Sequence, residues 1–259
     1  MRAARIWRLT GVVAVVFVLV MGAGQTLSLV ARQQRTEETE YPEAVHRLRL
    51  ETGSAYVRIK TGADGRVLLR KTLDWMVSEP EVRTGVVDGV MDVGVTCRRT
   101  PPFYNCGAQI ELEVPPGTEV TGEVTSGSVE VDGLTGPVHL EGTSGAIYLR
   151  RLSGEVHART TSGMVQGTEL DSERVDVGSG SGAVDLGFAG APREVSVSTG
   201  SGLVTVTVPR GSHYRISGRT GSGSSSIDPA LGDASSPNSL VAEVGSGELK
   251  IGYALGGDR

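Results

Sequence analysis

A Ser-Gly pair that recurs through the C-terminal half of the chain restricts the possible folds more than any other sequence feature. Subtracting the positions of successive pairs gives spacings of 18, 18, 19, 20, 21 and 24 residues. After each pair one position is skipped and an apolar residue follows, from Val129 in the first repeat to Leu249 in the last. The repeat at Ser222 alone departs from this rule, because three further serines delay the apolar residue to Ile227. The glycines that we expect at the corners of the repeat are Gly127, Gly145, Gly163, Gly182, Gly202, Gly223 and Gly247.

Each of the shorter units has room for two strands and two turns. In the first unit Val129 and Val131 alternate with Glu130, and a second turn signal, Leu134-Thr135-Gly136, falls midway. Alternation with a period of two residues is typical of a strand with one buried face. A unit of 18 residues cannot bury its own apolar face, so neighbouring units must stack. The sequence therefore predicts an all-β fold, a parallel β-helix or β-solenoid with coils of about 18 to 24 residues.

Stacking also accounts for the small residues at the corners. Equivalent positions of neighbouring coils lie about 4.7 to 4.9 Å apart. Glycine accepts a positive φ at such a bend, and Ser and Thr hydroxyls bond to backbone groups nearby. An antiparallel sandwich is the alternative, because hairpins that repeat every two strands also give an 18-residue period.

Composition and charge exclude several classes of protein. Glycine accounts for 37 of the 259 residues, about twice the usual share of about 7%, and only 4% of residues are aromatic. These values argue against a helical bundle and against a ligand pocket lined by aromatic groups.

The net charge is −5, and residues 1–35 hold five arginines and no acid, which leaves −10 for the rest. Nucleic acid is therefore not an expected partner, since its binding requires a clustered basic surface.

The N-terminal segment predicts a membrane anchor. Residues 9–31 form an uncharged stretch of 23 residues, and a helix of this length spans about 35 Å, enough to cross a hydrocarbon core of about 30 Å. Arg2, Arg5 and Arg8 precede it and should stay on the cytoplasmic side. A cleaved signal peptide is the alternative, with small residues at Gly22-Ala23-Gly24 near a possible cut.

Both alternatives export the rest of the chain. We expect a cytoplasmic tail at 1–8, a single-pass transmembrane helix at 9–31, a polar linker at 32–44 and an extracytoplasmic β-strand-repeat domain at 45–255. The membrane is thus the expected partner of the N-terminal segment.

The two cysteines predict a disulfide. Cys97 and Cys106 lie nine positions apart, too far for a redox Cys-x-x-Cys motif, and the four histidines are scattered, which disfavours a zinc site. A disulfide that closes the intervening loop fits an oxidising compartment outside the cytoplasm.

The chain resembles the bacterial adhesin-like β-strand-repeat families, especially the DUF4097 group. The resemblance rests on the segment 110–117 (IELEVPPG), on the Thr-Ser-Gly repeats and on the turn at 208–214 (VPRGSHY), and it covers about residues 45–255. It implies a parallel β-helix-like fold in an exported or membrane-attached protein, without an established reaction.

Candidate chemistry is confined to residues that should point outward. Carboxylates paired with arginine on one face are typical of β-helices that cleave polysaccharides; the candidates are Glu130, Asp132, Glu141, Glu155, Arg150, Arg159 and Asp185. His139 and His157 lie one period of 18 residues apart and should stack on the outside, where two histidines alone make an incomplete metal site. A charged outer face that keeps the fold soluble is the simpler interpretation of all these residues. We therefore predict no catalytic, cofactor-binding or metal-binding residues.

From these features we expect a membrane-anchored extracytoplasmic module without catalytic activity. It would serve in the cell envelope as a binding, adhesin-like or scaffold module, with an envelope polymer or a protein as its partner. A β-helix carbohydrate-active enzyme that acts on an envelope polysaccharide is the alternative.

Overall fold

The computed structural model describes residues 33–63, 65–76, 78–97 and 106–254. The expected cytoplasmic tail and membrane anchor lie outside these residues, as does the side chain of Cys106, on which the expected disulfide depends. No helix within the described ranges is long and apolar enough to cross a membrane.

The described chain consists of β-strands and a single short 3-10 helix, which confirms the all-β prediction. The strands are β1 (Gln33–Tyr41), β2 (Arg47–Thr52), β3 (Tyr56–Thr61), β4 (Val67–Trp75), β5 (Glu81–Val87), β6 (Val90–Thr96), β7 (Cys106–Val114), β8 (Glu119–Val124), β9 (Ser128–Asp132), β10 (Val138–Arg150), β11 (Val156–Leu170), β12 (Arg174–Phe188), β13 (Glu194–Val208), β14 (Arg215–Ile227) and β15 (Ser239–Tyr253), with the 3-10 helix η1 (Pro229–Leu231) between the last two.

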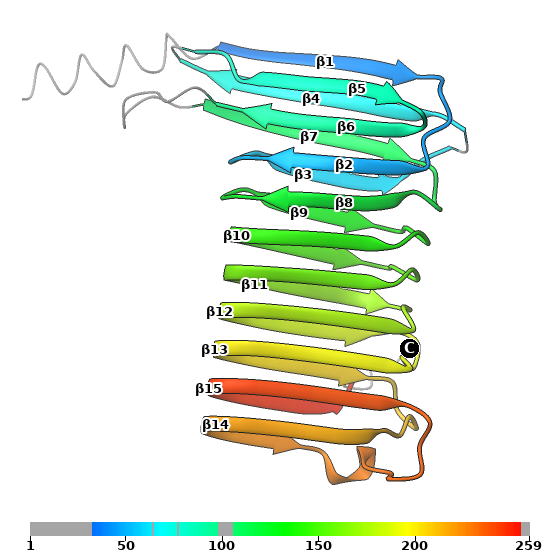
Figure 1. Cartoon of the computed structure of the whole chain (residues 1–259), viewed down its shortest axis with the longest axis vertical. Helices are drawn as coiled ribbons and strands as arrows, with labels where there is room; N and C mark the ends of the chain where they lie inside the picture. Colours follow the sequence, from blue (N-terminus) through cyan, green and yellow to red (C-terminus); the bar gives the residue numbers. More distant parts are fainter. Residues whose placement is uncertain (1–32, 64, 77, 98–105, 255–259) are drawn as a thin grey trace, which may run out of the picture.

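The strands form two ladders that run side by side along a tall stack (Figure 1). The part of β10 before its Ser-Gly pair is bonded to β8, and the part after it is bonded to β9. Each long strand from β10 to β15 therefore belongs first to one ladder and then, past its Ser-Gly pair, to the other. We call the β8 side the first ladder and the β9 side the second ladder, and one passage through both a layer.

Alternating apolar residues build the core between the two ladders. On β13, Val195 and Val197 from the first ladder and Val204 and Val206 from the second are buried. Ser196, between the first two, and Thr205, between the last two, are only half-buried. The buried side chains of successive layers form one continuous cluster. Because most of these side chains are Val, Leu and Ile, the core fills without large aromatic groups, as the composition indicated.

Pairing within the repeat is parallel and keeps equivalent residues opposite each other. Ser144 is opposite Ser162, Ser162 opposite Ser181, and Ser181 opposite Ser201. The hairpins of the sandwich alternative would require antiparallel neighbours, whereas β8 and all later strands in the described chain pair only in parallel.

Glycine at the corners is needed because neighbouring backbones approach each other closely. A Cβ added to Gly182 would lie 1.9 Å from the carbonyl oxygen of Gly163, and one added to Gly202 would lie 1.8 Å from that of Gly182. From the sequence, a positive φ was the expected reason for glycine at the corners, and this reason applies at Gly182, whose φ is 146°. The close approach of the neighbouring backbone, however, is common to every expected corner. The same contact occurs at Gly127, Gly145, Gly163, Gly223 and Gly247.

The layers do not follow the chain order at either end. Strand β15 lies between β13 and β14, so that Ser246 is opposite both Ser201 and Ser222. At the other end, β2 lies between β6 and β8, and β3 lies between β7 and β9 (Figure 1). The order of the layers therefore differs from the sequence order at both ends.

The outermost layer at the C-terminal end has a weakened core. On β14 the positions that point inward include Gly218 and Ser225, where the neighbouring strand β15 has Ala242 and Leu249. This is the repeat in which the serines interrupt the apolar pattern. The irregular repeat is therefore the end of the stack, and its two isoleucines, Ile216 and Ile227, are only partly buried against the core.

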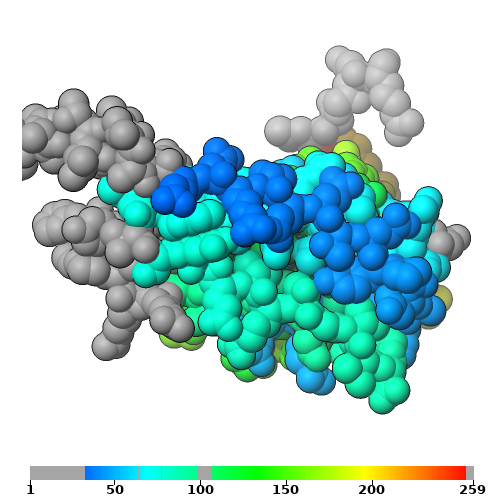
Figure 2. All heavy atoms as spheres, turned by 90° about the horizontal axis from the view of Figure 1, so that it is seen from above, coloured from blue at the N-terminus to red at the C-terminus, as the bar shows by residue number. Residues whose placement is uncertain are grey.

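The N-terminal end is closed by antiparallel strands that the sequence did not predict. Strand β1 pairs with β4, β4 with β7, and β5 with β6, all antiparallel, so the sheet is mixed rather than purely parallel. Gln33–Tyr41 is an edge strand here, not the linker expected at 32–44. Trp75, Val82 and Val86 pack against this end of the core. Seen from above, the N-terminal strands cover the end of the stack (Figure 2).

Candidate binding surface

On the second ladder, outward side chains of β4, β7, β3 and β9 form a row in which charged groups of opposite sign alternate, whereas on the first ladder Glu51, Glu123 and Glu141 are opposite one another. On the second ladder, Arg58 is opposite Glu111 on one side and Glu130 on the other. Neighbouring strands are only about 4.7 to 4.9 Å apart, so like charges in such a row would repel each other. Opposite charges instead form pairs, such as Lys60 with Glu113 at 2.8 Å.

Glu130 is the centre of the most buried of these charged clusters. Its side chain is 12% exposed. Its Oε2 atom accepts hydrogen bonds from the hydroxyl of Tyr56 at 2.5 Å and from Arg58 Nε at 3.0 Å, while Arg150 lies 3.8 Å from Oε1. The guanidinium of Arg58 also lies 5.7 Å from the ring centre of Tyr56, in cation-π contact. Three strands, β3, β9 and β10, thus contribute to one cluster.

The cluster keeps Glu130 ionised. Burial alone would raise its pKa, but the hydrogen bonds from Tyr56 and Arg58, together with the charges of Arg58 and Arg150, outweigh burial and lower the pKa. Burial and the hydrogen bond to Glu130 raise the pKa of Tyr56. A general acid of a glycosidase needs a raised pKa, and the environment of Glu130 acts in the opposite direction.

A surface hollow of about 450 Å³ opens beside this cluster. It is lined by Tyr56, Arg58, Glu130, Tyr148, Arg150, Gln166 and Thr168. In the row that contains Tyr56, the next two residues are the small Ser128 and Ala146, which leaves room beside the aromatic ring. We call these seven lining residues the tyrosine hollow.

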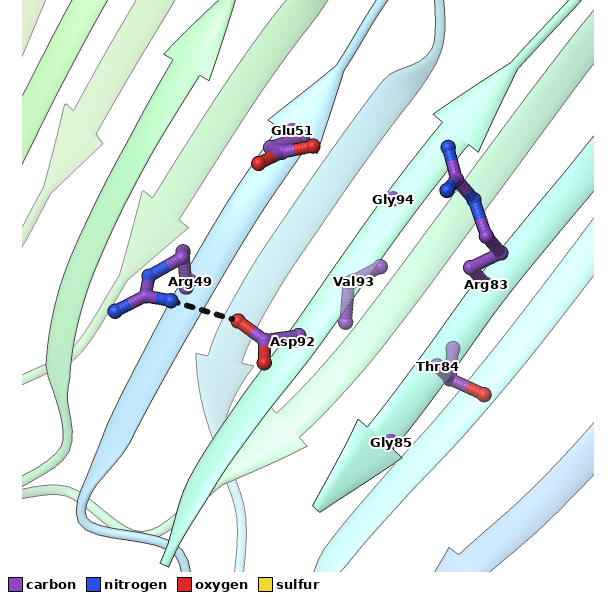
Figure 3. A pocket seen from close by; sticks show the side chains of 8 residues that line it. All are labelled: Arg49, Glu51, Arg83, Thr84, Gly85, Asp92, Val93 and Gly94. Carbon is purple, nitrogen blue, oxygen red and sulfur yellow. Dashed lines mark ion pairs between the residues drawn. The ribbon is translucent and has the colours of Figure 1, made fainter. Parts of the chain in front are cut away.

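Other hollows of similar size differ in charge. One of about 340 Å³ on β2, β5 and β6 is lined by Arg49, Glu51, Arg83 and Asp92 among others, so its charges balance, and Arg49 lies 3.5 Å from Asp92 (Figure 3). A second, of about 330 Å³ on the first ladder, is lined by Glu155, Arg174, Asp176 and Glu194 and is acidic.

The expected histidine pair is confirmed on the first ladder. The ring centres of His139 and His157 are 4.4 Å apart and their planes are 15° apart, so the rings stack. His157 Nδ1 lies 3.2 Å from Asp176, which also accepts hydrogen bonds from Arg159 at 2.8 and 3.0 Å. No cluster of three or more potential metal ligands was found among the described residues.

The remaining candidate residues are divided between the two ladders. Glu130, Asp132 and Arg150 lie together on the second ladder, where Asp132 pairs with Arg151 at 2.6 Å. Asp185 lies in the same row as Glu130, three strands away. Glu141, Glu155 and Arg159 lie on the first ladder and so cannot join them.

Sequence reasoning missed Tyr56, Arg58 and Tyr148 as parts of this cluster. Tyr56 and Arg58 belong to a layer before the first Ser-Gly pair, and their pairing with β9 spans more than 70 residues. A sequence signal was present, because Gly53-Ser54-Ala55 forms the corresponding corner of this earlier layer. There the backbone N–H groups of Ser126 and Ser128 donate hydrogen bonds to the carbonyls of Gly53 and Ala55.

Several solved protein structures are similar to this chain. No family model matches the chain, and no curated protein was found to be similar to it. A putative adhesin from Bacteroides fragilis is similar over 85% of this chain and 97% of its own, with 13% identity and a TM-score of 0.46. A putative cell adhesion protein from Clostridium sporogenes covers 86% of this chain and 100% of its own, with 15% identity and a TM-score of 0.39. A putative lipid binding protein from Parabacteroides distasonis is similar with 10% identity and a TM-score of 0.26. At these values the similarities do not assign the chain to a family.

Proposed function

We propose that the chain is a non-catalytic β-solenoid that is anchored in the cell membrane and acts outside the cytoplasm as a binding or adhesin-like module of the envelope. The observation that carries this proposal is the pair of long outer faces, on which polar and charged side chains stand in register from layer to layer. Such faces offer repeated contacts to an extended polymer or to a protein surface.

The solenoid interpretation is supported by the parallel register of the repeat and by the single core that the stacked layers share. The close contacts between corner glycines support it further, because they require each layer to lie directly against the next.

The anchoring interpretation is supported by the uncharged stretch at 9–31 and by the arginines that precede it. Strand β1 follows this stretch and lies at one end of the stack, while β14 lies at the other (Figure 1). With an anchor at 9–31, the stack would extend away from the membrane. Sodium carbonate extraction of cells that express the full chain tests this: an anchored chain stays in the pellet, and a released one refutes the anchor.

The non-catalytic interpretation is supported by the state of Glu130, which is held as a paired carboxylate. An enzyme of the β-helix type would instead need a protonated acid beside a free carboxylate.

Incubation with envelope fractions separates the two functions. Full-length protein in detergent micelles is mixed with cell-wall and polysaccharide fractions from bacteria, and both retention and reducing ends are measured. Saturable retention without new reducing ends is the expected result. Release of reducing ends would refute the non-catalytic function, and absence of retention by every fraction would refute the binding function.

A further inference from the structure

We propose that the tyrosine hollow binds the acidic groups of an anionic polysaccharide. This inference rests on the proposed binding function and names its site and the chemistry of its ligand.

The charge of the hollow favours an anionic ligand. Its lining contains two arginines and one glutamate, a net charge of +1, on a chain whose overall charge is −5. The hollow at Arg49 is balanced and the one at Glu155 is acidic. An anion is therefore attracted to the tyrosine hollow more strongly than to either of the other two.

The arginines keep donors for a ligand. The contact between Arg150 and Glu130 is 3.8 Å, beyond hydrogen-bond distance, and the side chain of Arg150 is 50% exposed. Arg58 uses its Nε and one terminal nitrogen on Glu130, whereas a guanidinium carries five N–H donors. A carboxylate or phosphate can accept hydrogen bonds from both guanidinium groups, and such charge-assisted bonds are stronger than neutral ones.

Glu130 acts as a positioning residue for this arrangement. It fixes Tyr56 and Arg58 by direct hydrogen bonds, so that part of the entropy cost of ordering these side chains is met before a ligand arrives. Glu111, the other neighbour of Arg58, lies 3.7 Å from Arg70 and is thereby partly neutralised.

Tyr148 and the neighbouring polar groups favour a sugar rather than a free ion. Tyr148 is half-buried and lies in the row between Glu130 and Gln166. An aromatic ring presents an apolar face, while Gln166 and Thr168 supply amide and hydroxyl groups for hydrogen bonds. A volume of about 450 Å³ lies within the range of about 300 to 1,000 Å³ typical of ligand sites.

Two anionic polymers and one neutral polymer test the proposal. Full-length protein in detergent micelles is titrated with polygalacturonate, which carries carboxylates, with poly(glycerol phosphate), which carries phosphates, and with dextran, which is neutral. We expect saturable binding to at least one of the anionic polymers, weakened by added salt, and no saturable binding to dextran. Equal binding of dextran, or binding of none of the three, would overturn the proposal. The two anionic arms decide between carboxylate and phosphate.

Variants locate the site. Arg150→Ala should weaken binding of the anionic polymer by about tenfold, the equivalent of one charge-assisted hydrogen bond, and Arg150→Lys should recover part of the loss. Tyr148→Ala, which removes the apolar ring face, should also weaken binding. Arg83→Ala, in the balanced hollow of Figure 3, should bind like the wild type. Circular dichroism and thermal unfolding of each variant confirm that the fold is retained.

The outcome distinguishes this inference from the function on which it rests. If Arg150→Ala binds the anionic polymer as well as the wild type does, the hollow is not the site, although retention by envelope fractions would still support the binding function. If the wild type is not retained by any envelope fraction, the binding function itself fails.

Discussion

Gly182 lies so close to Gly163 that a side chain at position 182 would collide with the neighbouring layer. The Cβ of an alanine at 182 would be 1.9 Å from the carbonyl oxygen of Gly163, and the φ of Gly182 is 146°. We expect Gly182→Ala to lower the free energy of unfolding by about 2 to 4 kcal/mol through backbone strain and displaced neighbours.

Urea denaturation measures this effect, and Gly252→Ala is the matched control. A Cβ on Gly252, in strand β15, meets no atom within 4 Å, so this substitution should change the stability by less than about 0.5 kcal/mol. Equal stability of the two variants would show that the layers can separate at the corner at little cost.

Replacement of Glu130 by glutamine should remove a pH-dependent contribution to stability. The folded-state pKa of Glu130 is lowered, so its contribution is fully present above the pKa of the unfolded carboxyl, about 4.3, and is lost as the pH falls through the lower folded-state value. At pH 7 we expect Glu130→Gln to lower the free energy of unfolding by about 1.5 to 3 kcal/mol, the range for hydrogen bonds to a charged group.

Thermal unfolding between pH 7 and pH 3 tests this prediction. The difference between wild type and Glu130→Gln should shrink below about pH 4.3. Glu141→Gln removes an exposed carboxylate from the first ladder and should have little effect at any pH. A difference for Glu130→Gln that persists unchanged at pH 3 would contradict the ionised cluster.

Paired cysteines can test the position of β15 between β13 and β14. Thr205 is opposite Lys250, and Lys250 is opposite Ser226. Two strands in contact are about 4.8 Å apart, and two strands separated by a third are about twice as far apart. A disulfide needs its two Cα atoms to lie within about 6.8 Å of each other. The double variant Thr205→Cys/Lys250→Cys should therefore crosslink on mild oxidation, and Thr205→Cys/Ser226→Cys should not. Peptide mapping without reduction identifies the bonds, and the reverse result would restore sequence order.

The disulfide between Cys97 and Cys106 stays a prediction. Alkylation of the denatured, unreduced protein should leave both cysteines unlabelled, and labelling should appear after reduction. Labelling of both without reduction would refute the disulfide and remove one argument for export.

The repeat made most of the architecture predictable, because its period of 18 residues and its alternating Val and Leu residues act locally. Strand positions, the core and the His139–His157 stack all follow from that period. The swapped layers could not be deduced in the same way, since several edges of similar shape compete for β15. The serines after Ser222 were nevertheless a usable signal, because a repeat that cannot fill a core fits the end of a stack.

The candidate site was less predictable than the fold. The repeat places Glu130 and Arg150 near each other through the register of β9 and β10. Tyr56 and Arg58 reach Glu130 only because β3 enters the stack beside β9. This placement depends on a pairing across more than 70 residues, for which the spacing of the repeat contains no information.

The position of β15 determines when the stack can be completed. Strand β14 leaves the ribosome before β15, yet β15 is the only long strand with which it pairs in the described structure. Docking of β14 in its final place must therefore wait until β15 has been synthesised, and exported if it is part of an outer protein. Until then β13 offers an open edge to any extended segment nearby. A chain that ends before Ser239 would lose both the inserted strand and the end layer that rests on it.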